Sequence, residues 1–142
     1  MKLRYLVVLS FFVPLFMFSG CFGNLPKTSK VNGHVTYEGN PLPNVMVSYV
    51  STVGTPTAIG STNVNGEFVL TTFNLRDGAI PGEYKVSIAP MKPAPTLETA
   101  SAAEIAAYKP PFPKHYFDAD TSGFTVQVEQ KVENNHQFNL QK

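Results

Sequence analysis

Residues 31–49, VNGHVTYEGNPLPNVMVSY, decide the fold of this chain. Their first seven positions alternate apolar residues or glycine with polar residues, which is the period of a strand with one buried face: the inward set is Val31, Gly33, Val35 and Tyr37. Residues 38–43, EGNPLP, then form a turn whose prolines fix the backbone dihedrals. The alternation resumes with Val45, Val47 and Tyr49. Two strands joined by a turn therefore open the folded part.

The same pattern continues towards the C-terminus. Apolar residues alternate with polar ones over 84–88, 124–128 and 138–140, and a weaker strand covers 57–62. Asn63-Val64-Asn65-Gly66 predicts a hairpin, since Asn-Gly tolerates the positive φ angles of tight turns. Short strands of this kind predict an all-β fold, a seven-stranded immunoglobulin-like or prealbumin-like β-sandwich over residues 30–142.

One stretch departs from the strand pattern. Residues 96–108 are rich in Ala and Glu, and residues 101–104, SAAE, resemble a capping box. Clusters of prolines lie on both sides, and proline interrupts helices and strand ladders alike. The sequence therefore predicts a short helical insertion near 96–108 on the surface of the sandwich.

The first twenty residues have the features of a signal peptide. Lys2 and Arg4 precede an apolar run over 6–18, which is shorter than the roughly 20 residues that span a bilayer. Phe18-Ser19-Gly20-Cys21 resembles a lipobox, and Cys21 is the chain's one cysteine. We expect removal of residues 1–20, attachment of acyl chains such as palmitate at Cys21, and a tether over 21–29. The alternative is a plain secretory signal followed by an incidental cysteine.

Charge limits the partners of the processed chain. Without Lys2 and Arg4, nine basic residues face ten acidic ones, so no basic surface for nucleic acid is expected. No polybasic patch for lipid headgroups is present either, so the expected membrane contact is the lipid on Cys21. Phe22 stands where Asp commonly retains lipoproteins in the inner membrane. The expected location is the cell envelope, with the outer membrane favoured.

Several segments together resemble one family. Residues 31–42 are similar to the opening V-x-G-x-V…G-x-P-L of carboxypeptidase-regulatory-like, or transthyretin-like, domains. Residues 60–68 resemble their G-x-T-D-x-x-G-x-F hairpin with Asn63 where Asp is usual, and residues 78–86 resemble G-A-x-P-G-x-Y-x-V. Residues 113–124 are similar to a segment of small bacterial lipoproteins of this kind. The resemblance spans about 30–141 and implies a prealbumin-like sandwich that usually lacks catalytic activity.

Side chains capable of chemistry are sparse. The three histidines at 34, 115 and 136 belong to no recognisable motif, and no nucleophile, base and carboxylate fall into a known arrangement. His34 and His136 form either a two-histidine metal site or, as favoured, solvated outward-facing positions on neighbouring strands. Asp118 and Asp120 are either cation ligands or, as favoured, turn-forming carboxylates. We expect a chain that is not an enzyme and has no cofactor and no metal.

Four aromatic residues give the remaining candidate site. Tyr108, Phe112, Tyr116 and Phe117 lie in the proline-rich stretch. They form either an exposed surface for glycan stacking or a protein interface or, as favoured, buried cover for one end of the core. The expected function is adhesion, scaffolding or envelope assembly through a protein or glycan partner. The alternative is a glycan- or small-ligand-binding module that uses the loop 90–117.

Overall fold

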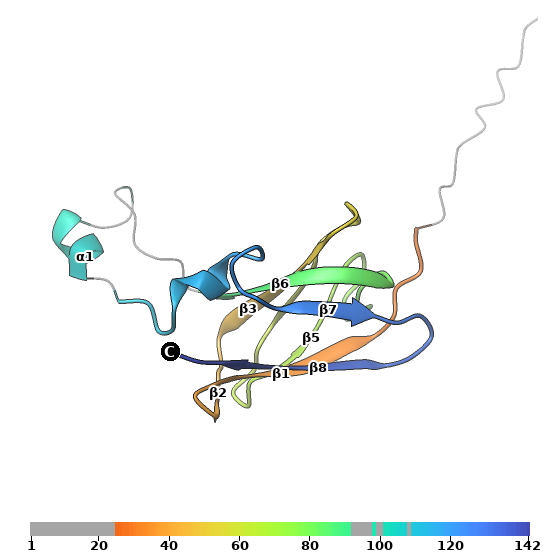
Figure 1. Ribbon diagram of the computed structural model, residues 1–142, viewed down its shortest axis with the longest axis horizontal. Helices are drawn as coiled ribbons and strands as arrows, with labels where there is room; N and C mark the ends of the chain where they lie inside the picture. The colour runs from red at the N-terminus through yellow and green to blue at the C-terminus, as the bar shows by residue number, and fades with distance from the viewer. Residues whose placement is uncertain (1–24, 92–97, 99–100, 108) are drawn as a thin grey trace, which may run out of the picture.

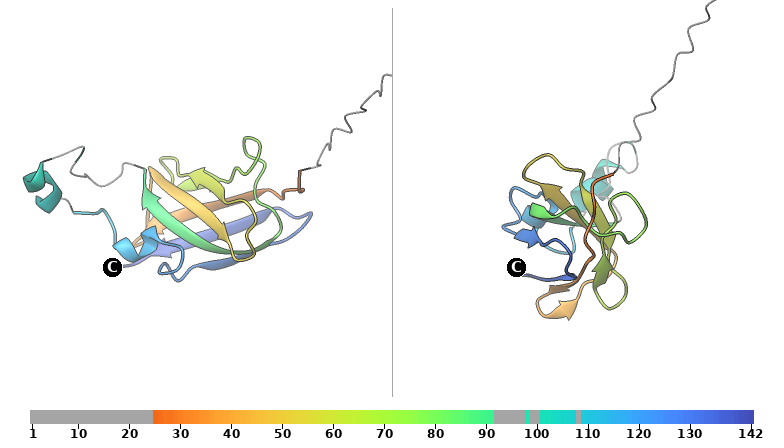
Figure 2. Two further views of the ribbon diagram at one scale, coloured as in Figure 1. Left: turned by 90° about the horizontal axis from the view of Figure 1, so that it is seen from above. Right: turned by 90° about the vertical axis from the view of Figure 1, so that its right-hand side faces the viewer.

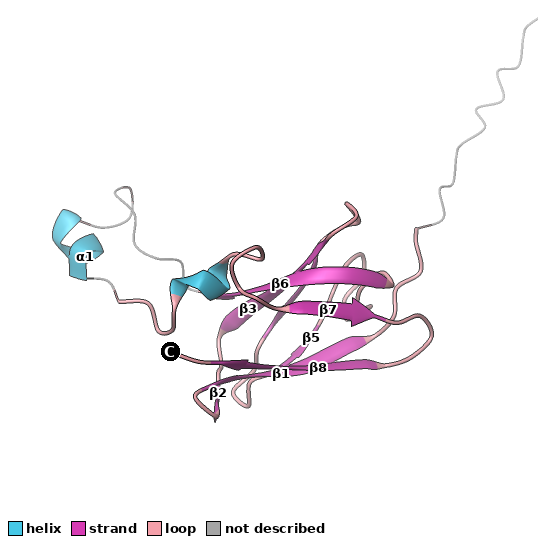
Figure 3. Cartoon of the chain, in the orientation of Figure 1, coloured by secondary structure: helices cyan, strands magenta, loops and turns pink. Residues whose placement is uncertain are grey.

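The computed structural model describes residues 25–91, 98, 101–107 and 109–142. Two four-stranded sheets face each other, as Figure 1 shows, and Figure 3 shows that strands dominate the chain. The first sheet contains β1 (Val31–Tyr37), β2 (Asn40–Pro41), β5 (Glu67–Val69) and β8 (Asn134–Leu140). The second contains β3 (Val45–Ser51), β4 (Ala58–Ser61), β6 (Gly82–Pro90) and β7 (Thr125–Val128). The predicted all-β sandwich is confirmed.

The first sheet is built around β1. Antiparallel β2 and β5 pair with β1 along one edge, while β8 runs parallel to it along the other, from Val31↔Asn134 to Tyr37↔Leu140. The first and last strands are therefore neighbours. The eighth strand, β2, was not predicted: it is only two residues long, and Pro41 is tolerated there because β2 is an edge strand.

The second sheet is antiparallel in the order β4-β3-β6-β7. One side of the sandwich is closed, because the backbones of Ile59 and Thr71 exchange two hydrogen bonds of 2.9 and 2.8 Å across the two sheets. At the other side, β7 and β8 form no ladder with each other. Backbone hydrogen bonds thus join the two sheets along one side of the sandwich, whereas side-chain contacts join them along the other.

The core follows the alternation of the strands. The fully buried side chains come from both sheets and include Val35, Val47, Tyr49, Val86 and Leu140. Gly33 lets the Phe68 ring cross β1, because a Cβ at this position would lie 2.5 Å from Cζ of that ring. The glycine is therefore required by close packing.

The predicted insertion contains one α-helix, α1 (Ala102–Ala107). Ser101 and Glu104 form the predicted capping box: the Ser101 backbone N–H donates to Glu104 Oε2 at 2.8 Å, and the Glu104 N–H donates to Ser101 Oγ at 3.4 Å. The remainder of the predicted range, 96, 97, 99, 100 and 108, lies outside the described residues. A 3₁₀ helix, η1 (Lys114–Phe117), follows.

Different segments of the chain extend from the two ends of the sandwich. The N-terminal segment joins β1 at one end, while the C-terminus and the stretch that carries α1 lie at the other (Figures 1 and 2). The backbones of Ser29 and Ala79 exchange hydrogen bonds of 2.8 and 3.0 Å, so the N-terminal segment is fixed to the sandwich at Ser29. The predicted signal peptide over 1–20 and the predicted lipidation site Cys21 lie outside the described residues. None of the described helices is long and apolar enough to cross a membrane.

Candidate functional site

The predicted aromatic site closes one end of the core. Phe112 and Tyr116 are buried, and the Tyr116 hydroxyl accepts the Gln141 backbone N–H at 3.0 Å. Phe117 is half-buried and packs edge-on against Phe112, with ring centroids 5.2 Å apart. Of the two interpretations, the favoured one, cover for the end of the core, is what the structure shows for these three rings, and the exposed stacking surface is not formed by them. Tyr108 lies outside the described residues.

The two strand histidines point to opposite faces of the first sheet. In the β1–β8 register His34 pairs with Gln137, and His136 pairs with Gly33, so the two side chains differ in parity. His34 lies on the outer face, where Nε2 is 2.6 Å from the Asn65 carbonyl oxygen. His136 lies on the inner face and is half-buried. A shared metal site is excluded by this geometry, and the expectation that both histidines face outward is wrong for His136.

His136 instead forms a polar contact across the core. Its Nδ1 lies 2.7 Å from the Tyr49 hydroxyl, and the ring also hydrogen-bonds the backbone of Gln127 on β7. Burial raises the pKa of the Tyr49 phenol far above its usual range, so the phenol keeps its proton. With the imidazole proton of His136 on Nε2, Tyr49 donates and Nδ1 accepts. Burial lowers the pKa of His136, an effect that the bond to Gln127 partly opposes. The neutral imidazole joins β3, β7 and β8 at the seam that lacks a ladder.

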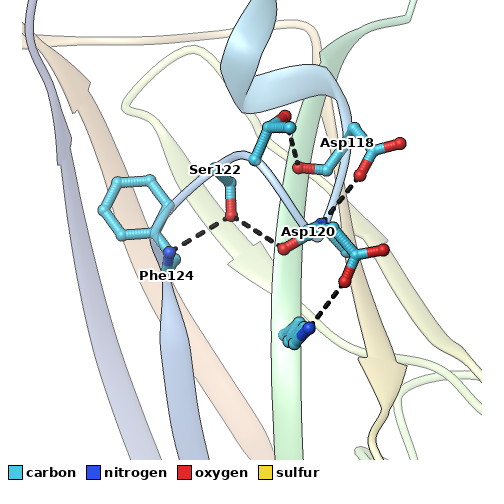
Figure 4. A network of polar contacts seen from close by, with 7 residues as sticks. Asp118, Asp120, Ser122 and Phe124 are labelled. Atoms are coloured by element: carbon cyan, nitrogen blue, oxygen red, sulfur yellow. Dashed lines mark hydrogen bonds and ion pairs between the residues drawn. The ribbon is translucent and has the colours of Figure 1, made fainter.

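The acidic loop before β7 is satisfied by the protein itself (Figure 4). Asp118 Oδ1 accepts the Asp120 N–H at 2.7 Å, and Asp120 pairs with Lys85 Nζ at 2.6 Å. The hydrogen bond and charge of Asp120 raise the pKa of Lys85. Ser122 Oγ accepts the Phe124 N–H at 3.2 Å. These contacts match the turn-forming interpretation, and no group of three His, Cys, Asp or Glu side chains within the described ranges is placed to hold a metal ion.

An apolar groove runs along the closed side of the sandwich, where β4 meets β5. Its volume is about 710 Å³, within the range of small-ligand sites. Exposed apolar side chains line it: Met46, Ile59, Leu75 and Met91. Arg76 and Glu67 are the charged residues on its wall. This arrangement suits a small, largely apolar ligand that carries one polar group.

Sequence reasoning did not identify this groove. Met46 and Ile59 occupy the outward positions of strands whose inward positions are buried, so alternation predicts them on the surface. Leu75 and Met91 come from loops. No spacing in the sequence indicates that these four side chains meet. An apolar residue at an outward strand position was the available signal.

The chain was compared with known proteins. No protein-family model matches it, and no curated protein matches it. Among solved structures it is similar to a 9R-lipoxygenase from Cyanothece PCC8801, with a TM-score of 0.38 and 15% sequence identity over 82% of this chain. The chain spans 16% of the length of that protein. The prediction that the chain is not an enzyme is contradicted by this match to an enzyme and is withdrawn. A likeness this low assigns no activity in its place.

Proposed function

We propose that the chain is a lipid-anchored lipoprotein of the bacterial cell envelope, whose sandwich presents its far end to a partner protein. One observation carries the proposal: the segment that leads from Cys21 enters one end of the sandwich, while α1 projects at the other (Figure 1). A domain with its anchor at one end and a projecting helix at the other holds that helix away from the membrane. We further propose, on the motifs quoted above, that the sandwich is of the carboxypeptidase-regulatory-like kind.

Chain lengths set the scale of this arrangement. Residues 22–29 reach roughly 25 Å at most, at about 3.3 Å per residue, before the fixed position of Ser29. The longest strand, β6, has nine residues and so extends about 30 Å along the sandwich. The near end is thereby kept close to the bilayer, and the far end lies about one strand length further out.

The far end offers a surface for a partner. In α1, residues 102–104 and 107 are exposed. A helix of six residues is marginal by itself in water, and the capping box stabilises its first turn. We propose that α1 and the segment around it form the contact with an envelope protein, which would order the helix further.

Detergent partitioning tests the anchor. The full-length wild type, expressed in a bacterial host, is expected in the detergent phase, and Cys21→Ser in the aqueous phase. Phe22→Ser is the matched control, since it changes the neighbouring residue and keeps the thiol; it should partition like the wild type. Equal aqueous partitioning of all three would contradict the anchor.

Site-specific photocrosslinking tests the presentation. A photoreactive residue at Ala103 on α1 should give a discrete adduct with one envelope protein in intact cells. The control position is Val50, exposed on the outer face of the second sheet, which should give none. Adducts that are equal at both positions, or absent at Ala103, would count against the far end as the contact.

The groove supports a second candidate function, binding of a small apolar ligand with an acidic group. The apolar walls would bury the ligand's chain, and Arg76 would meet the acid. Calorimetry with a medium-chain fatty acid tests it. Binding should be lost in Ile59→Glu and weakened in Arg76→Ala, but retained in Val50→Glu outside the groove. Absence of heat in the wild type would reject this function.

A further inference from the structure

We propose that the end of the sandwich where the N-terminal segment enters, called here the proximal end, docks onto the bilayer and places apolar loop tips in the lipid. The inference rests on the lipid anchor proposed above. Three loops surround the start of β1 at this end: 52–57, 70–81 and 129–133. The right-hand view of Figure 2 faces them. A lipid surface is the occupant because the chain that leads to Cys21 leaves from the middle of these loops.

Each proximal loop exposes one large apolar side chain. The exposed fractions are 77% for Val53, 85% for Leu75 and 46% for Val132. Leu25, in the segment between Cys21 and β1, is 62% exposed. Single exposed apolar residues need no explanation, but three on the loops around one chain exit, with a fourth on the exiting chain, form a contact surface. The hairpin at the far end exposes one such residue, Val64, at 83%.

The loop that carries Leu75 is held in shape by a carboxylate. Asp77 accepts backbone N–H groups from Thr72 at 2.7 Å, Phe73 at 3.0 Å and Asn74 at 2.9 Å. Burial opposes the charge, but these hydrogen bonds prevail and lower the pKa of Asp77. The loop is thus fixed by its backbone, and Leu75 remains exposed where the loop borders the groove instead of packing on the core.

The other two loops are fixed in the same manner. The buried Asn134 side chain accepts the Glu129 N–H at 2.8 Å and donates to the Val132 carbonyl at 3.2 Å, which sets the turn before β8. In the third loop, Thr52 donates both its backbone N–H and its hydroxyl to the Glu83 carbonyl, at 3.3 and 3.2 Å. Preformed loops lose little conformational entropy when their tips enter a lipid interface.

A hollow beside the Val132 tip carries positive charge. Its volume is about 450 Å³, and Lys27, Lys30 and Lys131 line it together with Glu133. Three ammonium groups next to an apolar tip suit the phosphate of a phospholipid headgroup, so the expectation that the chain has no basic patch for headgroups does not hold at this hollow. Glu133 in the hollow and three acidic residues elsewhere at this end, Asp77, Glu83 and Glu129, balance the lysines. The apolar tips and the acyl anchor are therefore expected to dominate attachment.

Fluorescent labels on the acylated full chain test the docking. Cysteine is introduced singly at Val53, Leu75 or Val132, or at Val64 as the matched far-end control, and carries an environment-sensitive fluorophore. Thioether formation leaves Cys21 unreactive. In vesicles of phosphatidylethanolamine and phosphatidylglycerol with brominated acyl chains, the three proximal labels should shift to the blue and be quenched. The control label should not.

The outcomes separate the docking from the anchor. An intact mass without acyl groups would refute the anchor, and the docking with it. Acylated protein whose proximal labels are quenched no more than the Val64 label would refute the docking alone. A second variant guards against an effect of the label: Leu75→Glu should reduce quenching at Val132, whereas Val64→Glu should leave it unchanged. Unchanged quenching in Leu75→Glu would also overturn the proposal.

Discussion

Replacement of Tyr49 by phenylalanine removes one hydroxyl from the centre of the core. Tyr49 is fully buried, and its hydroxyl lies 2.7 Å from Nδ1 of His136. Phenylalanine keeps the ring and its packing, so the cost arises from the lost hydrogen bond. A net hydrogen bond is worth about 0.5–1.5 kcal/mol, and a buried acceptor left unsatisfied costs about 1–3 kcal/mol. Since His136 is only half-buried, water relieves part of this cost, and we expect a loss of about 1–2 kcal/mol.

Urea titration of the full chain measures this loss, with Tyr37→Phe as the control. The Tyr37 hydroxyl forms no hydrogen bond with the residues that the structure describes, so its removal should cost less than about 0.5 kcal/mol. A cycle with His136→Leu isolates the pair: the cost of the double variant should fall short of the sum of the single costs. Additive costs, or a Tyr49→Phe variant as stable as the control, would refute the role assigned to this contact.

Four further outcomes follow, each read from urea midpoints. The pKa of His136 is lower in the folded chain than its value of about 6.5 in the unfolded chain, so between these two values the unfolded chain binds the proton and the folded chain does not. The free energy of unfolding should therefore fall as the pH drops below about 6.5. His136→Gln should flatten this step. The folded pKa of Asp77 is also lowered, so stability should decline a second time below about pH 4, where the unfolded carboxylate takes up a proton first. This second decline should vanish in Asp77→Asn. Gly78→Ala should cost about 2–4 kcal/mol, because φ is 91° and the new Cβ would meet backbone. Gly39→Ala, at φ 81° in open space, should cost only about 1–2 kcal/mol. Asn134→Ala should cost about 1–3 kcal/mol because it removes the side-chain partner of part-buried backbone groups of Lys30 and Glu129.

The alternation of apolar and polar residues predicted the strands, because each strand of the sandwich buries one face and exposes the other. Val45, Val47 and Tyr49 are fully or nearly buried at every second position of β3, and the weak strand over 57–62 is β4. The capping box also formed as predicted, since it depends on residues only three apart. Local signals of this kind need no knowledge of the rest of the chain.

The polar members of the core were missed although their parity was visible. Phe138 and Leu140 are the apolar residues of the predicted last strand, and the alternation that buries them puts His136 and Asn134 on the same face. The polarity of these two side chains favours an outward position, whereas their place in the alternation favours an inward one, and the structure follows the alternation. The partners that make burial tolerable, above all Tyr49, are distant in sequence and could not be identified from it.

The groove and the proximal surface could not be predicted for a different reason. Val53, Leu75 and Val132 lie in three separate loops, and no periodicity relates them. Their common position follows from strand directions: β3, β5 and β7 all end at the proximal end of the sandwich. Strand order and orientation, which the sequence pattern leaves open, therefore decide which loop residues share a surface.

The central claim is that Cys21 carries the membrane anchor, and the intact mass of the chain extracted from bacterial membranes tests it most directly. The account predicts a protein that begins at Cys21 and carries the added mass of a diacylglyceryl group, with or without a further acyl chain on its amino group. A chain that begins at another residue and has an unmodified thiol at Cys21, or lacks Cys21 altogether, would contradict it.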